Sequence, residues 1–308
     1  MPIVAVAWNW QYDAPFISAL ERACIERGIG FRSVTEENLA ECTSRAERGE
    51  LDWNLLLDRA WESDPRFLRL NRLAEAGGTH LLNPPARSAE TGNKAAMHTL
   101  LDAAGVPVPK LIEFRPESWD AKRFEACADG WRRPFWLKPA CHGGGDGVVP
   151  LPCLPDSFPL GPEWRNEPFV LQESAAPLRL RGRPAWFRVF NVFGRIFPLW
   201  WEPSTHRFDP VTPAETAELD LDCVSRTASA VGRIAGMSLF STEISVASPG
   251  IAEAIDPVND PVDLRPLSTA ADGIPDAVLA AMVETLADGI REITAATPVL
   301  HIRDGRTG

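Results

Sequence analysis

The sequence predicts an α/β (α+β) fold made of a small parallel-sheet domain and a larger strand-rich region. Short apolar strands alternate with an amphipathic helix in the first 84 residues, which is the pattern of a parallel sheet. Tight turns join pairs of apolar runs between residues 186 and 256, which is the pattern of antiparallel hairpins. An amphipathic helix is predicted to follow over residues 276–294.

The N-terminal domain is predicted to end at the Pro-rich joint Asn83-Pro84-Pro85. Strands are predicted at 3–8, 29–34 and 53–57. Between the first two strands, a helix buries one face and ends near Gly28. The apolar residues of that face are Phe16, Ile17, Leu20, Ala23 and Cys24.

Further elements are predicted over residues 85–308. They comprise a helix that ends at Gly105, a helix at 119–129, strands at 135–138 and 169–172, a hairpin at 186–200, a helix at 212–235, a hairpin at 239–256 and a frayed tail at 301–308. Thr212-Pro213-Ala214-Glu215 is a capping box with proline at the first helical position, so it marks a helix start.

Composition and charge limit the class of protein. Hydrophobic residues make up 45% and charged residues 24% of the 308 residues, which is ordinary globular usage. The net charge of −11 argues against nucleic acid and anionic membrane as partners. The six cysteines form no Cys-x-x-Cys pair, and no apolar run approaches membrane-span length. We therefore expect a soluble, cytoplasmic protein.

A glycine-rich turn follows the predicted strand at 135–138. It reads Lys138-Pro139-Ala140-Cys141-His142-Gly143-Gly144-Gly145-Asp146-Gly147. Glycines let backbone N–H groups close around phosphate oxygens without steric conflict, and the lysine adds a positive charge for the same phosphates. The turn is neither a Walker A loop nor a dinucleotide-binding fingerprint. A flexible surface loop is the alternative.

An acidic hairpin is the second chemical feature. Glu243 lies in one strand, and Asp256 and Asn259 lie in or just after the next strand. Oxygen ligands of this kind suit Mg²⁺, which binds through one or two carboxylates together with substrate phosphates. Polar decoration of a sheet face is the alternative, although unpaired carboxylates are costly to bury within apolar strands.

A lysine in a first helical turn is the third feature. Asn93-Lys94 opens the helix that ends at Gly105, and a positive charge there opposes the helix dipole. An anionic partner would explain Lys94, and a solvated surface lysine is the alternative.

The order of these motifs resembles the ATP-grasp superfamily over roughly residues 80 to 270. The resemblance is closest in style to carboxylate–amine ligases, such as glutathione synthetase and ribosomal-protein glutamate ligases. The motifs in order are the Lys94 helix, Gly105-Val106-Pro107-Val108-Pro109, Lys138-Pro139 with the glycine turn, Gln172-Glu173 after a strand, the Arg188 hairpin, and the acidic hairpin before Asn259-Asp260-Pro261.

The resemblance implies an ATP-grasp fold with an N-terminal parallel-sheet pre-ATP-grasp domain at 1–84. It implies a central lid subdomain at 85–165 and a C-terminal subdomain with a metal site at 166–308. ATP and Mg²⁺ would be the cofactors, with Mn²⁺ as an alternative ion. Contacts with ATP are implied for Lys94, Lys138, Gly143, Gly144, Gly145, Gly147, Gln172 and Glu173; metal binding for Glu243, Asp256 and Asn259; and catalytic roles for Arg188, Lys138 and Arg265.

Two departures from the family pattern concern these assignments. The metal strand usually ends in Glu-x-Asn, whereas Asp256-Pro257-Val258-Asn259 has a shorter acid, a spacing of three and a proline. A β-bulge could restore the geometry. The hairpin also lacks the acidic residue expected two positions before Arg188.

The implied activity is that of a carbon–nitrogen ligase (EC 6.3-type) that activates a carboxylate as an acyl-phosphate and joins it to an amine. Its substrates would be small molecules or peptides, and a homo-oligomer is left open. The alternatives are an ATP-grasp kinase and a non-catalytic ATP-binding regulator. His206 and Arg207 are candidates for binding the substrate carboxylate, with a surface histidine as the alternative, and most of the eleven tryptophans are expected in the core.

Overall fold

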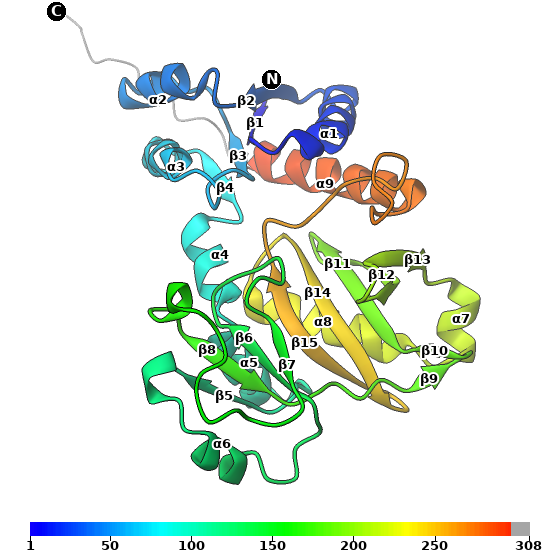
Figure 1. The fold of residues 1–308 in the computed structure, drawn as a ribbon. Coiled ribbons are helices and arrows are strands. Elements are labelled where there is room, and N and C mark those ends of the chain that lie inside the picture. Colours follow the sequence, from blue (N-terminus) through cyan, green and yellow to red (C-terminus); the bar gives the residue numbers. More distant parts are fainter. Residues whose placement is uncertain (297–308) are drawn as a thin grey trace, which may run out of the picture. The chain divides into compact units, whose positions relative to one another are not determined.

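The computed structural model describes residues 1–296, which form two compact units (Figure 1). Unit 1 combines residues 1–85 with residues 263–296, and unit 2 consists of residues 86–262. Residues 263–296 therefore belong with the N-terminal unit, which the sequence did not predict. The division of the remaining chain at residue 165 stays a prediction, and the predicted tail at 301–308 lies outside the described residues.

Unit 1 is a parallel sheet with helices on both faces. The strand order is β2-β1-β3-β4, and each neighbouring pair is parallel. Its elements are β1 (Ile3–Ala7), η1 (Gln11–Asp13), α1 (Ala14–Glu26), β2 (Gly30–Val34), α2 (Leu39–Glu47), β3 (Leu55–Asp58), α3 (Arg66–Ala76), β4 (His80–Leu82) and α9 (Asp276–Ala296). The parallel-sheet prediction for the N-terminal domain is confirmed.

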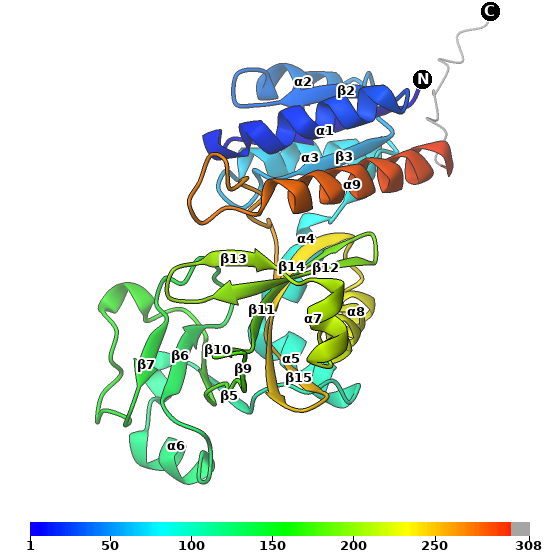
Figure 2. The same cartoon turned by 90° about the vertical axis from the view of Figure 1, so that its right-hand side faces the viewer.

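The two faces of this sheet are covered by different pairs of helices. Helices α2 and α3 bury Leu39, Phe67 and Leu70 against one face, and α1 and α9 lie together on the other (Figure 2). Arg27 at the end of α1 fixes α9, because its Nη2 and Nε lie 2.6 Å from Glu284 and 2.9 Å from Asp288. None of the helices within residues 1–296 is long and apolar enough to cross a lipid bilayer.

Unit 2 contains two larger antiparallel sheets and the helices that flank them. A four-stranded sheet has the order β5-β8-β6-β7, and a five-stranded sheet has the order β13-β12-β11-β14-β15. The helices are α4 (Pro85–Gly92), α5 (Lys94–Ala103), α6 (Ala121–Cys127), α7 (Pro213–Glu218) and α8 (Asp222–Ala235), with short η2 (Pro116–Ser118) and η3 (Pro162–Trp164). The strands are β5 (Leu111–Phe114), β6 (Phe135–Pro139), β7 (Val149–Leu151), β8 (Phe169–Gln172), β9 (Arg179–Leu180), β10 (Arg183–Pro184), β11 (Trp186–Val192), β12 (Arg195–Glu202), β13 (Arg207–Pro210), β14 (Leu239–Ser248) and β15 (Ile251–Asn259).

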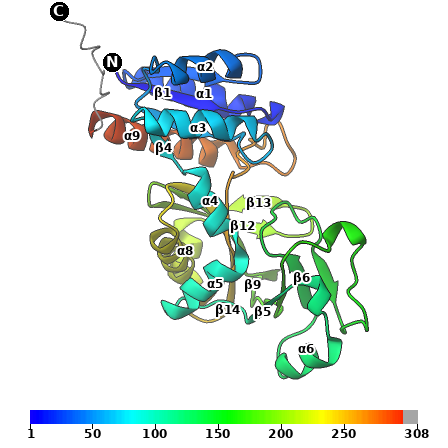
Figure 3. The same ribbon diagram turned by 90° about the vertical axis from the view of Figure 1, so that its left-hand side faces the viewer.

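Helix α8 covers one face of the five-stranded sheet. Phe187, Trp200 and Ile244 of the sheet share a buried cluster with Val224 and Ala228 of α8. Helix α5 lies beside α8 and contributes Met97 and Leu101 to a second cluster (Figure 3). One face of the sheet is therefore core, which leaves the opposite face for other roles.

The single helix predicted over 212–235 is wrong, because the structure has two helices there. Thr212 caps α7 as predicted, since its side chain accepts from Glu215 N–H and the Glu215 side chain accepts in return. The break lies at Asp220, whose φ of 51° is left-handed, and Leu221 N–H bonds the Thr216 carbonyl as in a Schellman motif. Asp tolerates this conformation better than most residues, so an apolar pattern alone could not reveal the break.

Candidate active site

A row of three charged residues crosses the five-stranded sheet on the face opposite α8. Arg188 of β11 pairs with Glu243 of β14, and Glu243 pairs with Asp256 of β15. Alternate residues of a strand share a face, so Ser241 and Ser245 of β14 lie on the same side as Glu243. The sheet therefore brings together three of the residues selected from the sequence.

A β-bulge accounts for the unusual metal strand. Ser241 pairs with Asn259 while Glu243 pairs with Asp256, so two steps along β14 match three steps along β15. Because of this extra residue, Asp256 and Asn259 both lie opposite residues of the Glu243 face, although they are three positions apart. Pro257, which has no N–H to give to the ladder, lies within this irregular stretch.

Arg188 is held by three neighbours. Its Nη1 donates to Glu243 Oε1 at 2.5 Å, and its Nε donates to Ser241 Oγ at 3.0 Å. The guanidinium also lies 5.5 Å from the centre of the Trp201 ring. Both members of the ion pair are largely buried, with side-chain exposures of 17% and 15%. The carboxylate two positions earlier that the family pattern led us to expect is replaced by this cross-strand partner.

Two lysines bring further positive charge to the same carboxylates. Lys94 Nζ lies 3.8 Å from Asp256 Oδ1 and donates to the His142 carbonyl at 2.6 Å. Lys138 lies on β6 of the four-stranded sheet, and its ammonium interacts electrostatically with Asp256 and Glu243. Burial lowers the pKa of Lys138, and the nearby carboxylates oppose that shift while Lys94 adds to it. Three cations and two carboxylates thus share one region of unit 2.

The pKa of Glu243 is raised above its ordinary value. Burial is the largest cause, and Asp256 adds repulsion, while Arg188, Lys138 and Lys94 act in the opposite direction. A carboxylate held in this way favours any additional positive charge close to it. Asn259 adds an amide on β15, the strand of Asp256, and its Nδ2 donates to the Ser241 carbonyl at 3.3 Å.

The side chain of Gln172 supports β15. Ile255 is the extra residue of a second β15 irregularity, since Glu243 pairs with Asp256 and Ile244 with Ala254. The Ile255 carbonyl accepts from Gln172 Nε2 at 3.0 Å, and His98 Nε2 lies 3.4 Å from it. Burial lowers the pKa of His98 to about 4, so the ring is neutral at pH 7. The predicted role of Gln172 with adenine or ribose stays a prediction.

The carboxylate of Glu173 is occupied by protein donors. It accepts from the Arg132 backbone N–H and from Arg132 Nη2, both at 3.1 Å, and Arg132 Nη2 also reaches Glu253 at 3.1 Å. Burial opposes ionisation of Glu173, but the hydrogen bonds and charge of Arg132, together with the Lys110 N–H, lower the pKa of Glu173. A contact between Glu173 and nucleotide likewise stays a prediction.

The glycine turn begins beside the start of α5. Lys94 N–H donates to the Ala140 carbonyl at 2.8 Å, and Asn93 caps α5 by accepting from Ala96 N–H. Gly144, Gly145 and Gly147 have φ of 73°, 84° and 71°. At Gly147 an added Cβ would lie 2.8 Å from Pro139 and 2.9 Å from Trp164, whereas Gly143 faces open space. The turn conformation therefore depends on glycine at three positions, and contact with phosphates stays a prediction.

Arg265 belongs to unit 1, whereas the other predicted site residues belong to unit 2. Its Nη2 is 2.7 Å from Asp263 and 3.0 Å from Asp272, and the guanidinium lies over the Trp10 ring. In the same unit, Arg59 and Asp13 form a buried ion pair with contacts of 2.7 and 2.8 Å at the carboxyl end of the parallel sheet. The catalytic assignment of Arg265 stays a prediction.

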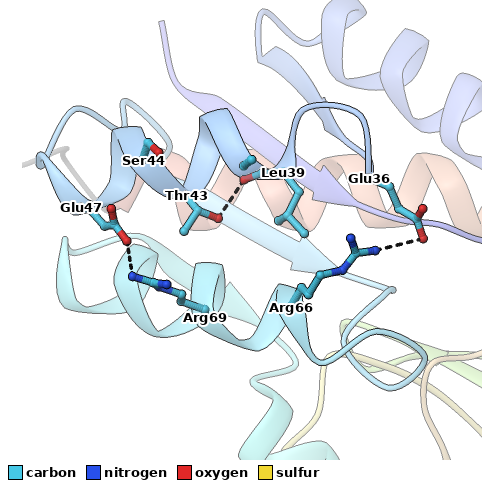
Figure 4. A pocket seen from close by; sticks show the side chains of 8 residues that line it. Glu36, Leu39, Thr43, Ser44, Glu47, Arg66 and Arg69 are labelled. Atoms are coloured by element: carbon cyan, nitrogen blue, oxygen red, sulfur yellow. Dashed lines mark hydrogen bonds and ion pairs between the residues drawn. The ribbon is translucent and has the colours of Figure 1, made fainter.

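A shallow groove between α2 and α3 of unit 1 is a weaker candidate for a ligand site. Its charged residues are already paired, since Arg69 donates to Glu47 and Arg66 lies 3.5 Å from Glu36 (Figure 4). Thr43 donates to the Leu39 carbonyl of its own helix. The groove therefore presents mutually satisfied groups and no cluster of groups suited to catalysis.

Solved structures with the same arrangement of elements identify the fold. A complex of the ATP-grasp ligase PsnB with its precursor peptide PsnA2 and AMPPNP has a TM-score of 0.57 and 16% identity, covering 95% of this chain and 97% of that chain. D-alanine–D-alanine ligase from Bacillus anthracis complexed with ATP has a TM-score of 0.58 and 15% identity, covering 95% and 99%. An ATP-grasp RimK domain protein from Sphaerobacter thermophilus has a TM-score of 0.61 and 17% identity, covering 93% and 98%.

The chain has the ATP-grasp fold. No family model matches it, and no curated protein matches it in sequence. The likeness is therefore structural, and it confirms the fold and the resemblance drawn from the order of the motifs. It extends over more than nine-tenths of the chain.

Several residues of the site could not be selected from the sequence. Arg132 and His98 act through long-range contacts, and their neighbours in sequence give no sign of this role. Ser241 could have been found, because it precedes Glu243 by two positions and must share its face. Trp201 lies on the face of Arg188 because it follows Leu199, the cross-strand partner of Arg188, by two positions.

Proposed function

We propose that the protein is an ATP-dependent ligase that activates a carboxylate as an acyl-phosphate and joins it to an amine, with release of ADP and phosphate. The observation that supports it best is the row Arg188–Glu243–Asp256 on the sheet face opposite α8, with Lys94 and Lys138 beside it. Three cations beside two carboxylates leave net positive charge when both carboxylates are ionised. A polyphosphate complements that charge.

The cations have separate tasks in this proposal. Lys94 and Lys138 bind the phosphates of ATP, and their flexible ammonium groups follow the charge as it moves to the leaving ADP. Arg188 lies beside them with a planar guanidinium, which suits a carboxylate or the oxygens of the transferred phosphoryl group. Glu243 and Ser241 hold the guanidinium in place before any substrate arrives.

The donor set of the acidic hairpin suits Mg²⁺. Glu243, Asp256 and Asn259 would hold the ion. Burial, with repulsion from Asp256, raises the pKa of Glu243, and a divalent cation would stabilise its ionised form. Within residues 1–296 no group of three or more His, Cys, Asp or Glu side chains could hold a metal by itself, so the ATP phosphates would complete the shell. When bound, Mg²⁺ neutralises phosphate charge.

The chemistry would proceed in two displacements. An oxygen of the substrate carboxylate attacks the γ-phosphorus, the bond to the β-phosphate oxygen breaks, and the electron pair leaves with ADP. The amine nitrogen then attacks the acyl carbon, and phosphate departs with its electron pair as the nitrogen loses a proton. The glycine turn would cover the phosphates and exclude water, because water would hydrolyse the acyl-phosphate.

The structural neighbours are consistent with this class of reaction. PsnB is an ATP-grasp ligase seen with a precursor peptide, and another neighbour joins D-alanine to D-alanine, so ligases of this fold act on peptides and on amino acids. Neighbouring structures contain ADP and Mg or ATP. We extend ATP use and ligation to this chain as a proposal, with a peptide or small-molecule substrate.

Thermal unfolding with ATP, with and without Mg²⁺, tests the nucleotide site first. A ligand that binds the native state raises the melting temperature according to its binding free energy. We expect an ATP shift that depends on Mg²⁺ in the wild type and is lost in Asp256→Asn. Asp288→Asn is the matched control, because Asp288 lies in unit 1 and pairs with Arg27. No shift with any nucleotide would refute the proposal.

Product analysis then separates ligation from the alternatives. A ligase releases free phosphate only when both a carboxylate and an amine are present, and Lys138→Ala should abolish that release. Phosphate that stays on the substrate would indicate a kinase instead. ATP binding without turnover across a panel of carboxylates and amines would indicate a regulatory protein.

A further inference from the structure

Aromatic side chains lie beside Arg188 on the sheet face opposite α8. Trp186 of β11 and Trp201 of β12 lie with ring centres 6.4 Å apart, and the His206 ring stacks on Trp201 at 6.0 Å with an interplanar angle of 21°. Both indoles are half-buried and His206 is exposed. We call Trp186, Trp201 and His206 the aromatic strip.

The register of the strands fixes the side on which the strip lies. Trp186 precedes Arg188 by two positions, so the two residues share a face. Trp201 follows Leu199, and Leu199 is the cross-strand partner of Arg188. Phe187 and Trp200 point to the opposite face, where they belong to the α8 core. The strip is therefore no part of that core, and it lies one row along the strands from Arg188–Glu243–Asp256, on the same face.

Two buried polar atoms lie one row away from the ion pair without a hydrogen-bond partner. Trp186 pairs with Ser245 across β11 and β14, and neither Trp186 Nε1 nor Ser245 Oγ has a partner among the described residues. Ser245 is 0% exposed. Unpaired polar groups at such depth are uncommon and cost stability, and they recur where a ligand or water supplies the missing bond. This observation is independent of the ring geometry.

The backbone at His206 adds a third indication. His206 has φ of 56°, a conformation that costs a residue other than glycine free energy, and it is held there because its N–H donates to the Glu202 carbonyl at 2.8 Å. The turn between β12 and β13 thereby presents the imidazole to Trp201. Local strain that places a ring beside a candidate active site is typical of a binding feature.

We propose that the aromatic strip is the subsite for the side chain of the substrate whose carboxylate is activated, and that it selects an aromatic side chain. The inference rests on the proposed ligase function, because it takes Arg188 as the group nearest the reacting carboxylate. A substrate ring stacked on the two indoles would lie beside the Arg188 guanidinium. The polar backbone of the same substrate would lie near Trp186 Nε1 and Ser245 Oγ.

The chemistry of the strip distinguishes an aromatic ligand from other classes. The positive charge of Arg188, which already lies over Trp201, repels a cationic side chain at the same place. A second carboxylate would compete for Arg188 with the first. Aromatic pairs gain attraction beyond the area that they bury, whereas an aliphatic side chain gains only the burial.

Fluorine NMR on the full chain with AMPPNP and Mg²⁺ tests the inference without turnover. The probe is N-acetyl-4-fluoro-L-phenylalanine, which has a free carboxylate and an aromatic side chain. Its carboxamide lacks the carboxylate, and N-acetyl-5,5,5-trifluoro-L-leucine replaces the ring by an aliphatic group. We expect the aromatic acid to bind at least tenfold more tightly than the carboxamide and at least fivefold more tightly than the aliphatic acid.

Variants locate the binding. Trp201→Leu and Trp186→Leu should each weaken the aromatic acid about tenfold, and Trp186→Leu should leave the AMPPNP thermal shift within experimental error. Trp61→Leu, a half-buried tryptophan of unit 1, is the control and should leave probe binding unchanged. If a tryptophan variant does not fold, His206→Asn serves instead, since Asn accepts a positive φ and His206 is exposed; it should weaken the probe at least threefold.

The outcomes separate this inference from the proposed function. Equal binding of the aromatic and aliphatic acids, or unchanged affinity in both tryptophan variants, would overturn the aromatic subsite. If AMPPNP shifts the melting temperature but neither acid binds, the subsite is wrong and the ligase proposal stands. If AMPPNP itself does not bind, the proposed function is refuted and the subsite with it.

Discussion

Removing the guanidinium of Arg188 should destabilise unit 2 because it leaves Glu243 without its principal partner. The two side chains are 17% and 15% exposed and their closest atoms are 2.5 Å apart, so the pair is nearly removed from solvent. Breaking such a pair from one side costs about 3–5 kcal/mol. Lys94 and Lys138 still attract Glu243, which places our expectation for Arg188→Met near the lower value, about 3 kcal/mol.

The double variant decides whether that loss comes from the ion pair. Glu243→Gln removes the buried charge and its repulsion from Asp256, and we expect it to cost about 1 kcal/mol. Combining it with Arg188→Met should restore most of the stability, to within about 1 kcal/mol of the wild type. The expected coupling free energy is then about 3–4 kcal/mol.

Urea unfolding followed by far-ultraviolet circular dichroism and by tryptophan fluorescence provides the measurement. The free energies are comparable only where the two transitions coincide, which is the test of two-state behaviour. A double variant that loses the sum of the two single losses would refute the argument, because the pair would then contribute no coupling. Under the proposed function, all three variants should also lose carboxylate-dependent phosphate release.

Three further outcomes follow from individual contacts. Gly147→Ala should lower the melting temperature, because a Cβ there would lie 2.8 Å from Pro139 and the φ of 71° is unfavourable for alanine. Gly143→Ala should change the melting temperature little, and equal effects of the two variants would contradict this reasoning. Burial raises the pKa of Asp58 from 3.8 to about 6, so its ionisation costs about 3 kcal/mol, and stability should fall as pH rises from about 4 to 6. Asp58→Asn should flatten that part of a urea-unfolding pH profile, and an unchanged slope would count against it. Arg132→Met should cost about 2 kcal/mol at pH 7, because Glu173 loses its charged donor and keeps only backbone N–H donors. The difference should shrink as pH falls and Glu173 becomes protonated in both proteins, and a pH-independent difference would exclude this cause.

Local signals in the sequence predicted much of the fold. The capping box at Thr212 and the apolar strand at Phe169–Gln172 lie where the structure has them, because each depends on a few neighbouring residues. The break at Asp220 was missed, since a left-handed aspartate leaves the apolar pattern intact on both sides. The membership of α9 in unit 1 was also missed, because it depends on contacts such as Arg27 with Asp288, which are 261 residues apart.

The candidate site was predictable as a set of residues and unpredictable as a set of contacts. The sequence selected Glu243, Asp256 and Asn259, but it could not show how Asp256 and Asn259, three positions apart, reach the same face of the sheet. The β-bulge answers that question, and bulges depend on the partner strand as much as on the bulged one. Arg188 was selected from the order of motifs, whereas its partners Ser241 and Trp201 follow only from strand register.

The bulge residue Ile255 has a further consequence for the site. Its carbonyl accepts from Gln172 at the end of β8, with His98 of α5 beside it, and Asp256 is the next residue. Lys138 lies on β6, which pairs with β8, the strand of Gln172. The side-chain hydrogen bond from Gln172 to the Ile255 carbonyl therefore helps to position Lys138 relative to Asp256. A side-chain amide that appeared suited to nucleotide in the sequence thus joins the two sheets of unit 2. Gln172→Leu should therefore disturb the charges around Asp256 even in the absence of ATP, and a raised Mg²⁺ requirement in the thermal-shift experiment would measure that disturbance.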